Sequence, residues 1–273
     1  MRKVNIGPDV EVLPRRFDFV ERGLSRVDAG VGVVGQAVFH GCIVTLSWPR
    51  AWAERLLPDG LALATPGGSD RPPNHPVVAI FGEQTQGATV FGGVPLPMNI
   101  RYPEFAIAIP FVQRPGSHRI QTFVPAMGSG YFPAIWHGNQ FYGFSKARIT
   151  IERRGSLVWM SGPTGGLWMH AAVAAETRWS RRRELEGTAL DEIEAALRLP
   201  ILGQRADGSL VQSWWDLAFR HSLVRVCSAW VAFEKAFVAG LPVGVHQAEP
   251  LHSVEVRGML WQLSWPTRFD REA

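Results

Sequence analysis

The sequence predicts an α+β protein that consists mainly of antiparallel β-strands with a few short helices. Many short segments are either alternately apolar and polar or continuously apolar, which is the pattern of half-buried and buried strands. Clusters of Gly and Pro, of which the chain contains 28 and 20, separate these segments and mark turns. Two segments have helical periodicity and are flanked by residues that typically begin or end helices.

In the N-terminal half, residues 32–48 are rich in Val, Ile and Phe and predict a strand that Gly41 interrupts with a turn or bulge. Residues 50–57 predict a short helix, because Pro49 lies near its start and Pro58 ends it. The composition of the following segments predicts a surface loop at residues 65–76 and a buried strand at residues 77–81. It also predicts a loop near the expected binding pocket at residues 84–97 and a second buried strand at residues 105–109.

In the C-terminal half, the Gly-rich segment 162–166 predicts a hairpin turn and not a phosphate-binding loop, since no Gly-Lys-Ser/Thr follows it. Residues 188–199 have the clearest helical pattern, with Thr188 as the cap. Residues 211–237 contain neither Gly nor Pro and fit a long helix by pattern, but their β-branched and aromatic residues favour strands. Further strands are expected at residues 120–124, 157–160, 167–173 and 253–265, and a loop at residues 128–130.

The composition is that of an ordinary globular protein, with 46% hydrophobic and 19% charged residues. No segment has the composition of a linker, so we expect a single domain over residues 1–273, in which residues 1–30 form an arm. The 11 Trp and 15 Phe residues suit the interior of a β barrel or cone, or an oligomer interface. The net charge is +4, and basic residues form one cluster, at residues 178–183. This cluster is more typical of a solvated helix start than of a nucleic-acid binding site.

Several classes of site have no support in the sequence. Cys42 and Cys227 lie in apolar surroundings and are expected to be buried free thiols. The eight His residues lack metal-binding spacing, and neither a nucleophile elbow nor a dinucleotide fingerprint occurs. No signal peptide is recognised, and the best candidate for a membrane span, residues 223–241, contains charged residues. We therefore expect a cytoplasmic location.

Lys146 is the main candidate for catalysis. It is the only lysine between Lys3 and Lys235, and it follows an aromatic-Gly-aromatic segment at residues 142–144. The alternation of residues 148–152 predicts that Lys146 lies where a half-buried strand begins. Burial among rings disfavours an ammonium ion, and a neutral amine is a nucleophile for carbonyl carbons. The alternative is an ordinary lysine at a strand end whose charge reaches water.

Two segments together resemble the acetoacetate decarboxylase family. Residues 137–146 (HGNQFYGFSK) are similar to the family segment that contains the imine-forming lysine, which implies that role for Lys146. Residues 101–110 (RYPEFAIAIP) are similar to the family's Tyr-x-Glu motif and the strand that follows it. The resemblance implies that Glu104, at the start of this strand, is the active-site glutamate, and that the fold is the family's antiparallel cone or barrel.

The segment departs from the family pattern next to the lysine. Ala147 stands where the family has a second lysine, Ser145 stands in place of a proline, and Asn139-Gln140 in place of Arg-Glu. In acetoacetate decarboxylase a neighbouring cation activates the reactive lysine, and Ala147 supplies none. Acetoacetate itself is therefore not assigned as the substrate.

Lys146 and Glu104 are the expected catalytic residues, and no metal ligand is expected. Arg101 and Arg148 could bind a substrate carboxylate, although an outward-facing strand arginine is the alternative for each. His137 is interpreted as a structural histidine. The residues expected to bind the substrate are Arg101, Tyr102, Phe144, Arg148, Glu83 and His40.

The resemblance implies an imine-forming lyase that decarboxylates a β-keto acid or a related carbonyl compound through Lys146. No bound cofactor is expected, because the imine turns the substrate's own carbonyl into the electron sink. The alternatives are an aldolase or aldolase-dehydratase that acts on a keto acid with the same lysine, and a non-catalytic protein that binds a small molecule. The expected partners are a keto acid or aldehyde and further copies of the chain in a homo-oligomer, without nucleic acid or membrane.

Overall fold

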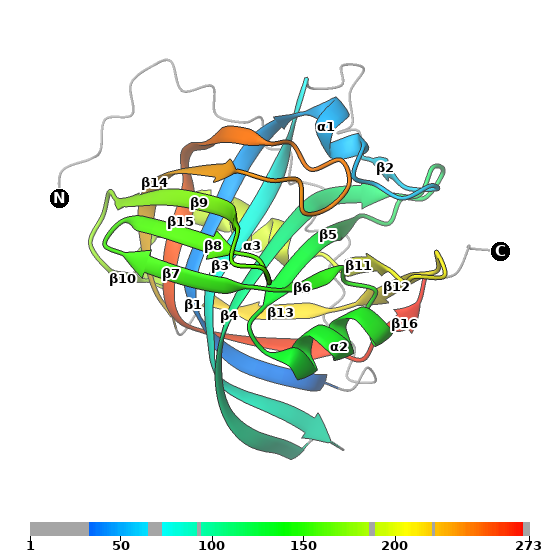
Figure 1. The fold of residues 1–273 in the computed structure, drawn as a ribbon, viewed down its shortest axis with the longest axis horizontal. Helices are drawn as coiled ribbons and strands as arrows, with labels where there is room; N and C mark the ends of the chain where they lie inside the picture. The colour runs from blue at the N-terminus through cyan, green and yellow to red at the C-terminus, as the bar shows by residue number, and fades with distance from the viewer. Residues whose placement is uncertain (1–32, 65–72, 92–93, 186–188, 220–221, 270–273) are drawn as a thin grey trace.

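The computed structural model describes residues 33–64, 73–91, 94–185, 189–219 and 222–269, whose strands form one 16-stranded sheet (Figure 1). The strands of the first part of the chain are β1 (Val33–Pro49), β2 (Ala62–Leu63), β3 (Asn74–Phe91), β4 (Val94–Gln113), β5 (Gln121–Ser129), β6 (Lys146–Arg148), β7 (Thr150–Arg154) and β8 (Leu157–Ser161). Those of the second part are β9 (Leu167–Ala175), β10 (Ser180–Arg181), β11 (Ile201–Gln204), β12 (Leu210–Ser213), β13 (Trp215–Ala218), β14 (Leu223–Phe233), β15 (Gly244–Ser264) and β16 (Thr267–Arg268). The helices are α1 (Arg50–Glu54), α2 (Phe132–Phe141), the 3-10 turn η1 (Arg182–Leu185) and α3 (Ala189–Leu197).

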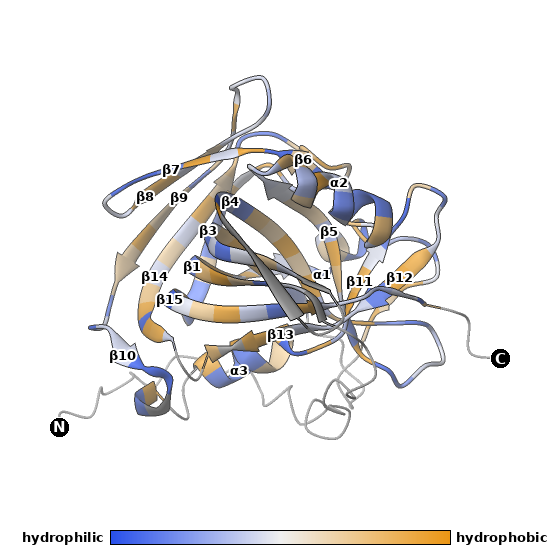
Figure 2. Ribbon diagram, turned by 90° about the horizontal axis from the view of Figure 1, so that it is seen from below, coloured by the Kyte–Doolittle hydropathy of each residue, from blue (hydrophilic) through white to orange (hydrophobic). Residues whose placement is uncertain are grey.

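The sheet is antiparallel except where β5 pairs with β6 and with β11. Its central path runs β5-β4-β3-β1-β15-β14-β9-β8-β7. These strands curve around an interior, and α3 packs on one side of the sheet against β15, β13 and β4 (Figure 2). The predicted class, mainly antiparallel β with a few short helices, is therefore confirmed.

Alternate residues of β1 enter two hydrophobic clusters, one on each face of the sheet. Cys42, Val44 and Leu46 belong to one cluster, whereas Phe39 and Ile43 belong to the other. Successive side chains of a strand point to opposite faces, so a sheet that is covered on both sides needs apolar residues at nearly every position. This explains why the central strands appear in the sequence as continuous apolar runs.

The prediction of a bulge at Gly41 is confirmed. The pairing of β1 with β15 shifts register between Phe39 and Gly41. On its other side Gly41 lies opposite Gly82, and a Cβ atom on Gly41 would come within 2.4 Å of the Phe81 carbonyl oxygen. Only glycine allows the two backbones to approach this closely.

Two of the expected loops are strands instead. Residues 84–97 were predicted as a loop, but the described parts, 84–91 and 94–97, lie in the paired strands β3 and β4, whose pairing continues to Phe91 and Val94. Register shifts around Gly87 let the strands absorb the glycine. Residues 128–130 were also expected as a loop, yet Gly128 and Ser129 are buried members of β5. In both places, hydrogen bonding to neighbouring strands outweighs the turn preference of the local sequence.

The helices also differ in part from expectation. Helix α2 was not predicted, since it contains Gly138 and has no capping side chain. Helix α1 ends at Glu54 and is thus shorter than residues 50–57. Helix α3 lies within the predicted range, and Thr188, its expected cap, lies outside the described residues. The described residues of the segment 211–237 form the strands β12, β13 and β14 with short connections and no long helix, as their β-branched residues indicated. None of the helices in the described ranges is long and apolar enough to span a membrane.

Candidate active site

Helix α2 and strand β6 form a crossover that starts from β5. Strand β6 pairs in parallel with β5, with Lys146 opposite Met127 and Ala147 opposite Gly128. Parallel neighbours cannot be joined by a tight hairpin, so the chain between them needs a crossover connection. Helix α2 provides it and lies beside both strands, as Figure 1 shows. Lys146, the first residue of β6, is thereby fixed at the end of a short, structured segment.

Two residues of α2 set the position of Lys146. The side-chain amide of Asn139 donates to the Lys146 carbonyl oxygen at 3.0 Å, and its oxygen accepts from the Lys146 backbone N–H at 2.7 Å. Gly138 leaves room for the lysine side chain, because a Cβ atom at this position would lie 2.7 Å from Lys146 Cδ. The Asn and Gly of the lysine segment thus hold the backbone and clear the path of the side chain.

The amine of Lys146 meets the carboxylate of Glu104. Lys146 Nζ donates to Glu104 Oε1 at 2.8 Å, and both side chains are only 9% exposed. Glu104 lies within β4, whereas the sequence had indicated the start of a strand. A buried ion pair such as this one is costly to desolvate, so it is retained mainly where it has a role beyond stability.

A chain of hydrogen bonds links Glu104 to a residue near the C-terminus of the sequence. Gln84 Nε2 donates to Glu104 Oε2 at 2.8 Å, and Gln84 Oε1 accepts from Trp261 Nε1. Because the Gln84 amide is fixed by both contacts, it orients the carboxylate without contributing a charge. Glu104 therefore has one cationic partner, Lys146, and one neutral partner.

These side chains border a cavity of about 300 Å³, which is at the lower end of the range for small-molecule sites. Tyr102 and Phe144, both expected to bind the substrate, line it together with the catalytic candidates. Most of the remaining lining is aromatic or small. The cavity is lined by Gly35, Gln36, Gly87, Ala88, Thr89, Ile100, Tyr102, Glu104, Tyr131, Pro133, Ala134, Trp136, His137, Gly138, Tyr142, Phe144, Lys146, Trp261 and Leu263.

Burial changes the acid–base behaviour of two lining residues. It lowers the pKa of His137, and the nearby charge of Lys146 lowers it further, so the imidazole is neutral near pH 7. Burial raises the pKa of Tyr102, and the Glu104 carboxylate adds to this effect. Both side chains therefore present uncharged surfaces to the cavity. The interpretation of His137 as purely structural did not anticipate its place in this lining.

Four of the expected substrate-binding residues lie away from the lysine cavity. Arg101 pairs with Glu83, and both line a separate pocket of about 690 Å³ together with His40. Tyr102 and Glu104 face the lysine cavity, so the alternation of β4 turns Arg101 to the opposite face. Arg148 is exposed at the end of β6.

The second pocket adjoins another buried glutamate, Glu255. Its carboxylate accepts from Arg153 Nη1 at 2.6 Å and from Arg225 Nε at 2.8 Å. The Arg225 guanidinium also lies 4.6 Å from the Trp179 ring centroid, so it is held by an aromatic face as well. This glutamate has two guanidinium partners where Glu104 has an amine and an amide.

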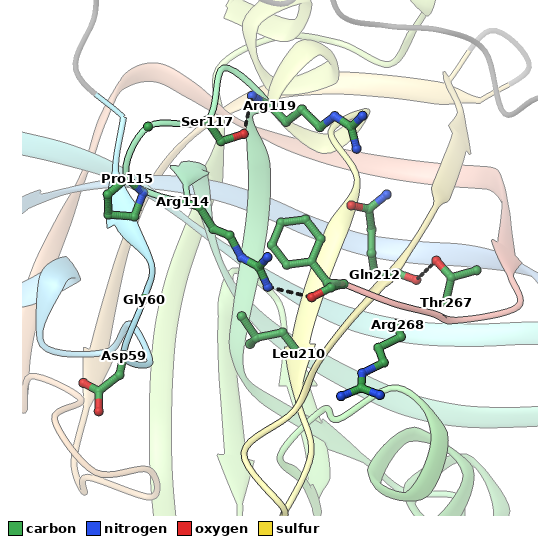
Figure 3. A pocket seen from close by; sticks show the side chains of 12 residues that line it. Asp59, Gly60, Arg114, Pro115, Ser117, Arg119, Leu210, Gln212, Thr267 and Arg268 are labelled. Carbon is green, nitrogen blue, oxygen red and sulfur yellow. Dashed lines mark hydrogen bonds between the residues drawn. The ribbon is translucent and has the colours of Figure 1, made fainter. Parts of the chain in front are cut away.

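Figure 3 shows a third pocket, of about 760 Å³, between the loop that follows β4 and the C-terminal strand β16. In it Arg114 donates to the Phe269 carbonyl oxygen at 2.6 Å, and its guanidinium lies 4.2 Å from the centroid of the Phe269 ring. Its described lining contains neither a lysine nor a histidine or cysteine. Among the three pockets, the Lys146 cavity alone combines a buried amine with a buried carboxylate.

The solved structures of other proteins identify the fold. The enduracididine biosynthesis enzyme MppR in complex with pyruvate superposes with a TM-score of 0.60 at 16% identity, covering 89% of this chain and 93% of that chain. Acetoacetate decarboxylase from Legionella pneumophila gives a TM-score of 0.59 at 10% identity, over 92% and 95% of the two chains. This chain has the acetoacetate decarboxylase-like fold.

An acetoacetate decarboxylase-like enzyme from Sphingomonas wittichii RW1 is similar to the same extent, with a TM-score of 0.58, 15% identity and coverage of 88% and 94%. At these identities the similarity demonstrates the fold of the chain, as the resemblance of its two motifs implied, and not its activity. No protein-family model matches the sequence, and no curated protein matches it.

The side chains of Gln84, Asn139 and Trp261, which hold Lys146 and Glu104 in place through hydrogen bonds, are among the site residues that were not assigned a role from the sequence. Gln84 could have been found by alternation, because Ile80, Gln84 and Glu104 border one face while Phe81 and Glu83 border the other. Trp261 carries no local signal, since it lies 177 positions from its partner Gln84. In the described part of the chain, no group of three or more His, Cys, Asp or Glu residues could hold a metal ion.

Proposed function

We propose that this protein is an enzyme that forms an imine between Lys146 and a carbonyl substrate and then cleaves a carbon–carbon bond. The observation that carries the proposal is the contact of 2.8 Å between Lys146 Nζ and Glu104 Oε1 beside a cavity of about 300 Å³. The fold supports it, because solved structures with this fold include acetoacetate decarboxylases and MppR in complex with pyruvate.

In the first stage Glu104 accepts a proton from the Lys146 ammonium group, which frees the amine to attack the substrate carbonyl carbon. The resulting carbinolamine loses its hydroxyl group as water, with Glu104 returning the proton, and an iminium ion forms on Lys146. A carboxylate at hydrogen-bonding distance is suited to both transfers. The iminium then accepts the electron pair of a bond β to its nitrogen.

Decarboxylation is the first route from the iminium. If the substrate is a β-keto acid, the bond to the carboxylate breaks, carbon dioxide leaves, and the electron pair forms an enamine. Glu104 is a carboxylate at that stage, so it takes up a proton from water and passes this proton to the enamine carbon. Water then hydrolyses the regenerated iminium and releases the ketone from Lys146. The substrate's carbonyl serves as the electron sink, so no cofactor is required by this sequence of steps.

Retro-aldol cleavage is the second route, and the lining of the cavity favours it. If the β carbon carries a hydroxyl group, Glu104 takes the hydroxyl proton, the carbon–carbon bond breaks, and an aldehyde leaves. In the described lining, the cationic partner of Glu104 is Lys146 itself, and no arginine is present to bind a departing carboxylate. An alcohol is a neutral substrate group that Glu104 can deprotonate directly.

The test is intact-mass measurement after incubation with a carbonyl compound and borohydride, which reduces an imine to a stable amine. A panel of keto acids, aldehydes and hydroxy-ketones is used on the wild type, Lys146→Ala and Lys235→Ala. Lys235 is an exposed lysine and serves as the matched control. We expect one adduct on the wild type and on Lys235→Ala, and none on Lys146→Ala.

An absence of adduct on the wild type with the whole panel would contradict the imine proposal and favour a non-catalytic binding protein. Once an adduct is found, the two routes are separated by their products, carbon dioxide or an aldehyde. We also propose a homo-oligomer, as the resemblance implied. Light scattering during gel filtration gives the mass of the assembly and would contradict this by showing a monomer.

A further inference from the structure

We propose that the substrate of the Lys146 site is an uncharged carbonyl compound that carries an aromatic ring. This assignment rests on the proposed imine chemistry and adds to it the chemical class of the substrate. It differs from the small keto acids that the sequence led us to expect.

Aromatic side chains form much of the cavity wall. The rings of Tyr102 and Tyr131 are stacked at 5.5 Å, and those of Tyr142 and Phe144 at 5.4 Å. Stacked pairs hold each ring in a fixed orientation, so the wall has flat surfaces against which a flat ligand can pack. A ligand with an aromatic ring gains both buried apolar area and ring contacts there, whereas a short aliphatic keto acid gains little of either.

The polar ends of two wall residues are already occupied within the protein. The Tyr142 hydroxyl donates to the Ser264 carbonyl oxygen at 2.9 Å, and Trp261 Nε1 donates to Gln84. Each residue therefore offers its ring and not a hydrogen bond to the cavity. Trp136 also lines the cavity and is 51% exposed, so it lies at the opening, where an incoming ring would cover it.

The charges around the cavity are balanced before any ligand enters. Lys146 and Glu104 are in direct contact, and burial together with the charge of Lys146 keeps His137 neutral near pH 7. When a neutral carbonyl compound forms the imine, the iminium ion replaces the ammonium ion beside Glu104 and the balance is kept. A carboxylate on the substrate would add a desolvated negative charge close to Glu104, which is unfavourable.

An uncharged substrate has no carboxylate to lose, so the bond that breaks leads to an alcohol carbon. In balanced form, a β-hydroxy ketone and the Lys146 ammonium ion give water and the iminium ion. Glu104 takes the hydroxyl proton, the bond breaks with its electron pair moving to the iminium, and an aromatic aldehyde leaves. The proton returns from Glu104 to the enamine carbon, and water releases the ketone from Lys146.

Three aldol adducts test the assignment. The first is the adduct of acetone and benzaldehyde, which is neutral and aromatic. The second is the adduct of pyruvate and benzaldehyde, in which a carboxylate replaces a methyl group. The third is the adduct of acetone with itself, which is neutral and lacks the ring. For each, the concentration that gives half-maximal borohydride-trapped adduct is measured by intact mass on the wild type and on Lys146→Ala.

We expect the neutral aromatic compound to reach half-maximal trapping at a concentration about tenfold lower than either of the other two, which is a modest difference in binding free energy. Equal or stronger trapping of the pyruvate adduct would overturn the charge part of the assignment, and equal or stronger trapping of the ring-free compound would overturn the aromatic part. Either result leaves the imine proposal intact. No trapping of any compound, or trapping that persists in Lys146→Ala, would overturn the imine proposal and this assignment with it.

A charge introduced into the wall provides a second measurement. Gln36 lines the cavity from β1, and Gln36→Arg places a guanidinium there, while Gln36→Met is a control of similar length without charge. We expect Gln36→Arg to move the preference toward the pyruvate adduct by about tenfold relative to Gln36→Met. An unchanged ratio in a folded Gln36→Arg variant would contradict the charge balance as the basis of selection.

Discussion

Two of the buried glutamates, Glu104 and Glu255, have different kinds of partner. Glu104 is 7% exposed and contacts the amine of Lys146 and the amide of Gln84. Glu255 is 5% exposed and contacts the guanidinium groups of Arg153 and Arg225. Burial opposes ionisation of Glu255, but the hydrogen bonds from the two arginines outweigh it and hold the pKa of this carboxyl below its ordinary value.

The difference lies in what the partners can do with a proton. A guanidinium does not give up its proton in a protein, so Glu255 is fixed as a carboxylate between permanent cations. An ammonium group can lose a proton to a neighbouring carboxylate and become a nucleophile. Burial alone therefore does not identify a catalytic carboxylate, and the role proposed for Glu104 depends on its partner, an amine that can exchange a proton.

The largest expected effect is that of Glu104→Gln on bond cleavage. The amide keeps the shape of the side chain but cannot accept a proton, so we expect cleavage to slow by about a thousandfold. Imine formation should also slow, because Glu104 takes part in both of its proton transfers, but after long incubation borohydride should still trap an imine on Lys146, so that cleavage can be measured separately from imine formation. Product release is followed by chromatography under single-turnover conditions. A rate close to that of the wild type would remove Glu104 from the mechanism.

Glu255→Gln should produce the reverse pattern. The change leaves the guanidinium groups of Arg153 and Arg225 without their anion, and we expect a loss of about 3 kcal/mol of unfolding free energy in urea titrations. Cleavage by the folded variant should stay within about twofold of the wild type, because the residue does not line the Lys146 cavity. If the folded variant were as stable as the wild type, Glu255 would not contribute to stability, and the proposed difference between the two carboxylates would be wrong.

Gly138→Ala should reduce both activity and stability. Alanine is the better helix former by up to about 1 kcal/mol, but separating the buried Lys146–Glu104 pair costs more than this, so the unfolding free energy should fall. The new Cβ atom would lie 2.7 Å from Lys146 Cδ, so the lysine side chain must move away from Glu104. We expect imine trapping about tenfold slower, a factor that corresponds to about 1.4 kcal/mol.

Gly166→Ala is the control for this substitution, because Gly166 lies in a separate hairpin turn and its added Cβ would meet no atom within 4 Å. Trapping by Gly138→Ala as fast as by this control would show that the lysine path tolerates a methyl group.

The smallest effects are expected in the pH dependence of stability, which distinguishes the two regions. Folding lowers the pKa of His137, so the unfolded state binds more protons, and this residue costs stability as pH falls below about 6.5. Folding also lowers the pKa of Glu255, whose contribution is present above about pH 4.3 and is lost as pH falls through its folded pKa.

Urea titrations between neutral and acid pH measure both contributions. His137→Phe should reduce the loss of unfolding free energy that occurs as pH falls below the ordinary pKa of histidine. Glu255→Gln should reduce the loss of unfolding free energy that occurs as pH falls below the ordinary pKa of glutamate. If either variant changed the loss in the other pH range instead, the assignment of these two titrations would be wrong.

Lys146 and Glu104 could be predicted from the sequence because each lies in a contiguous motif. The shared face of Tyr102 and Glu104 could be predicted as well, since residues two apart in a strand point the same way. The same alternation places Arg101 on the opposite face, so strict use of it excludes Arg101 from the lysine cavity. Arg148 is separated from Lys146 by the same spacing of two, but it lies where β6 ends and is exposed.

The rest of the site depends on contacts that are distant in the sequence. Trp261 meets Gln84 only because β15 and β3 both pair with β1. Helix α2 has no capping side chain and forms where parallel pairing of β5 and β6 requires a crossover. Residues 84–97 have the composition of a loop, yet pairing within the β3–β4 hairpin extends them. Local propensity is a weak guide where tertiary contacts decide the conformation.

The crossover from β5 through α2 to β6 also bears on how such a protein can evolve. It carries Trp136 and His137 on the cavity wall, Asn139 as the backbone anchor and Lys146 as the proposed nucleophile, all within one short stretch of chain. A substitution or insertion that reshapes this wall therefore moves Lys146 as well. We expect the substrate range to change more readily without displacing Lys146 through substitutions on β1, β3 and β15, which border the same cavity without holding the lysine.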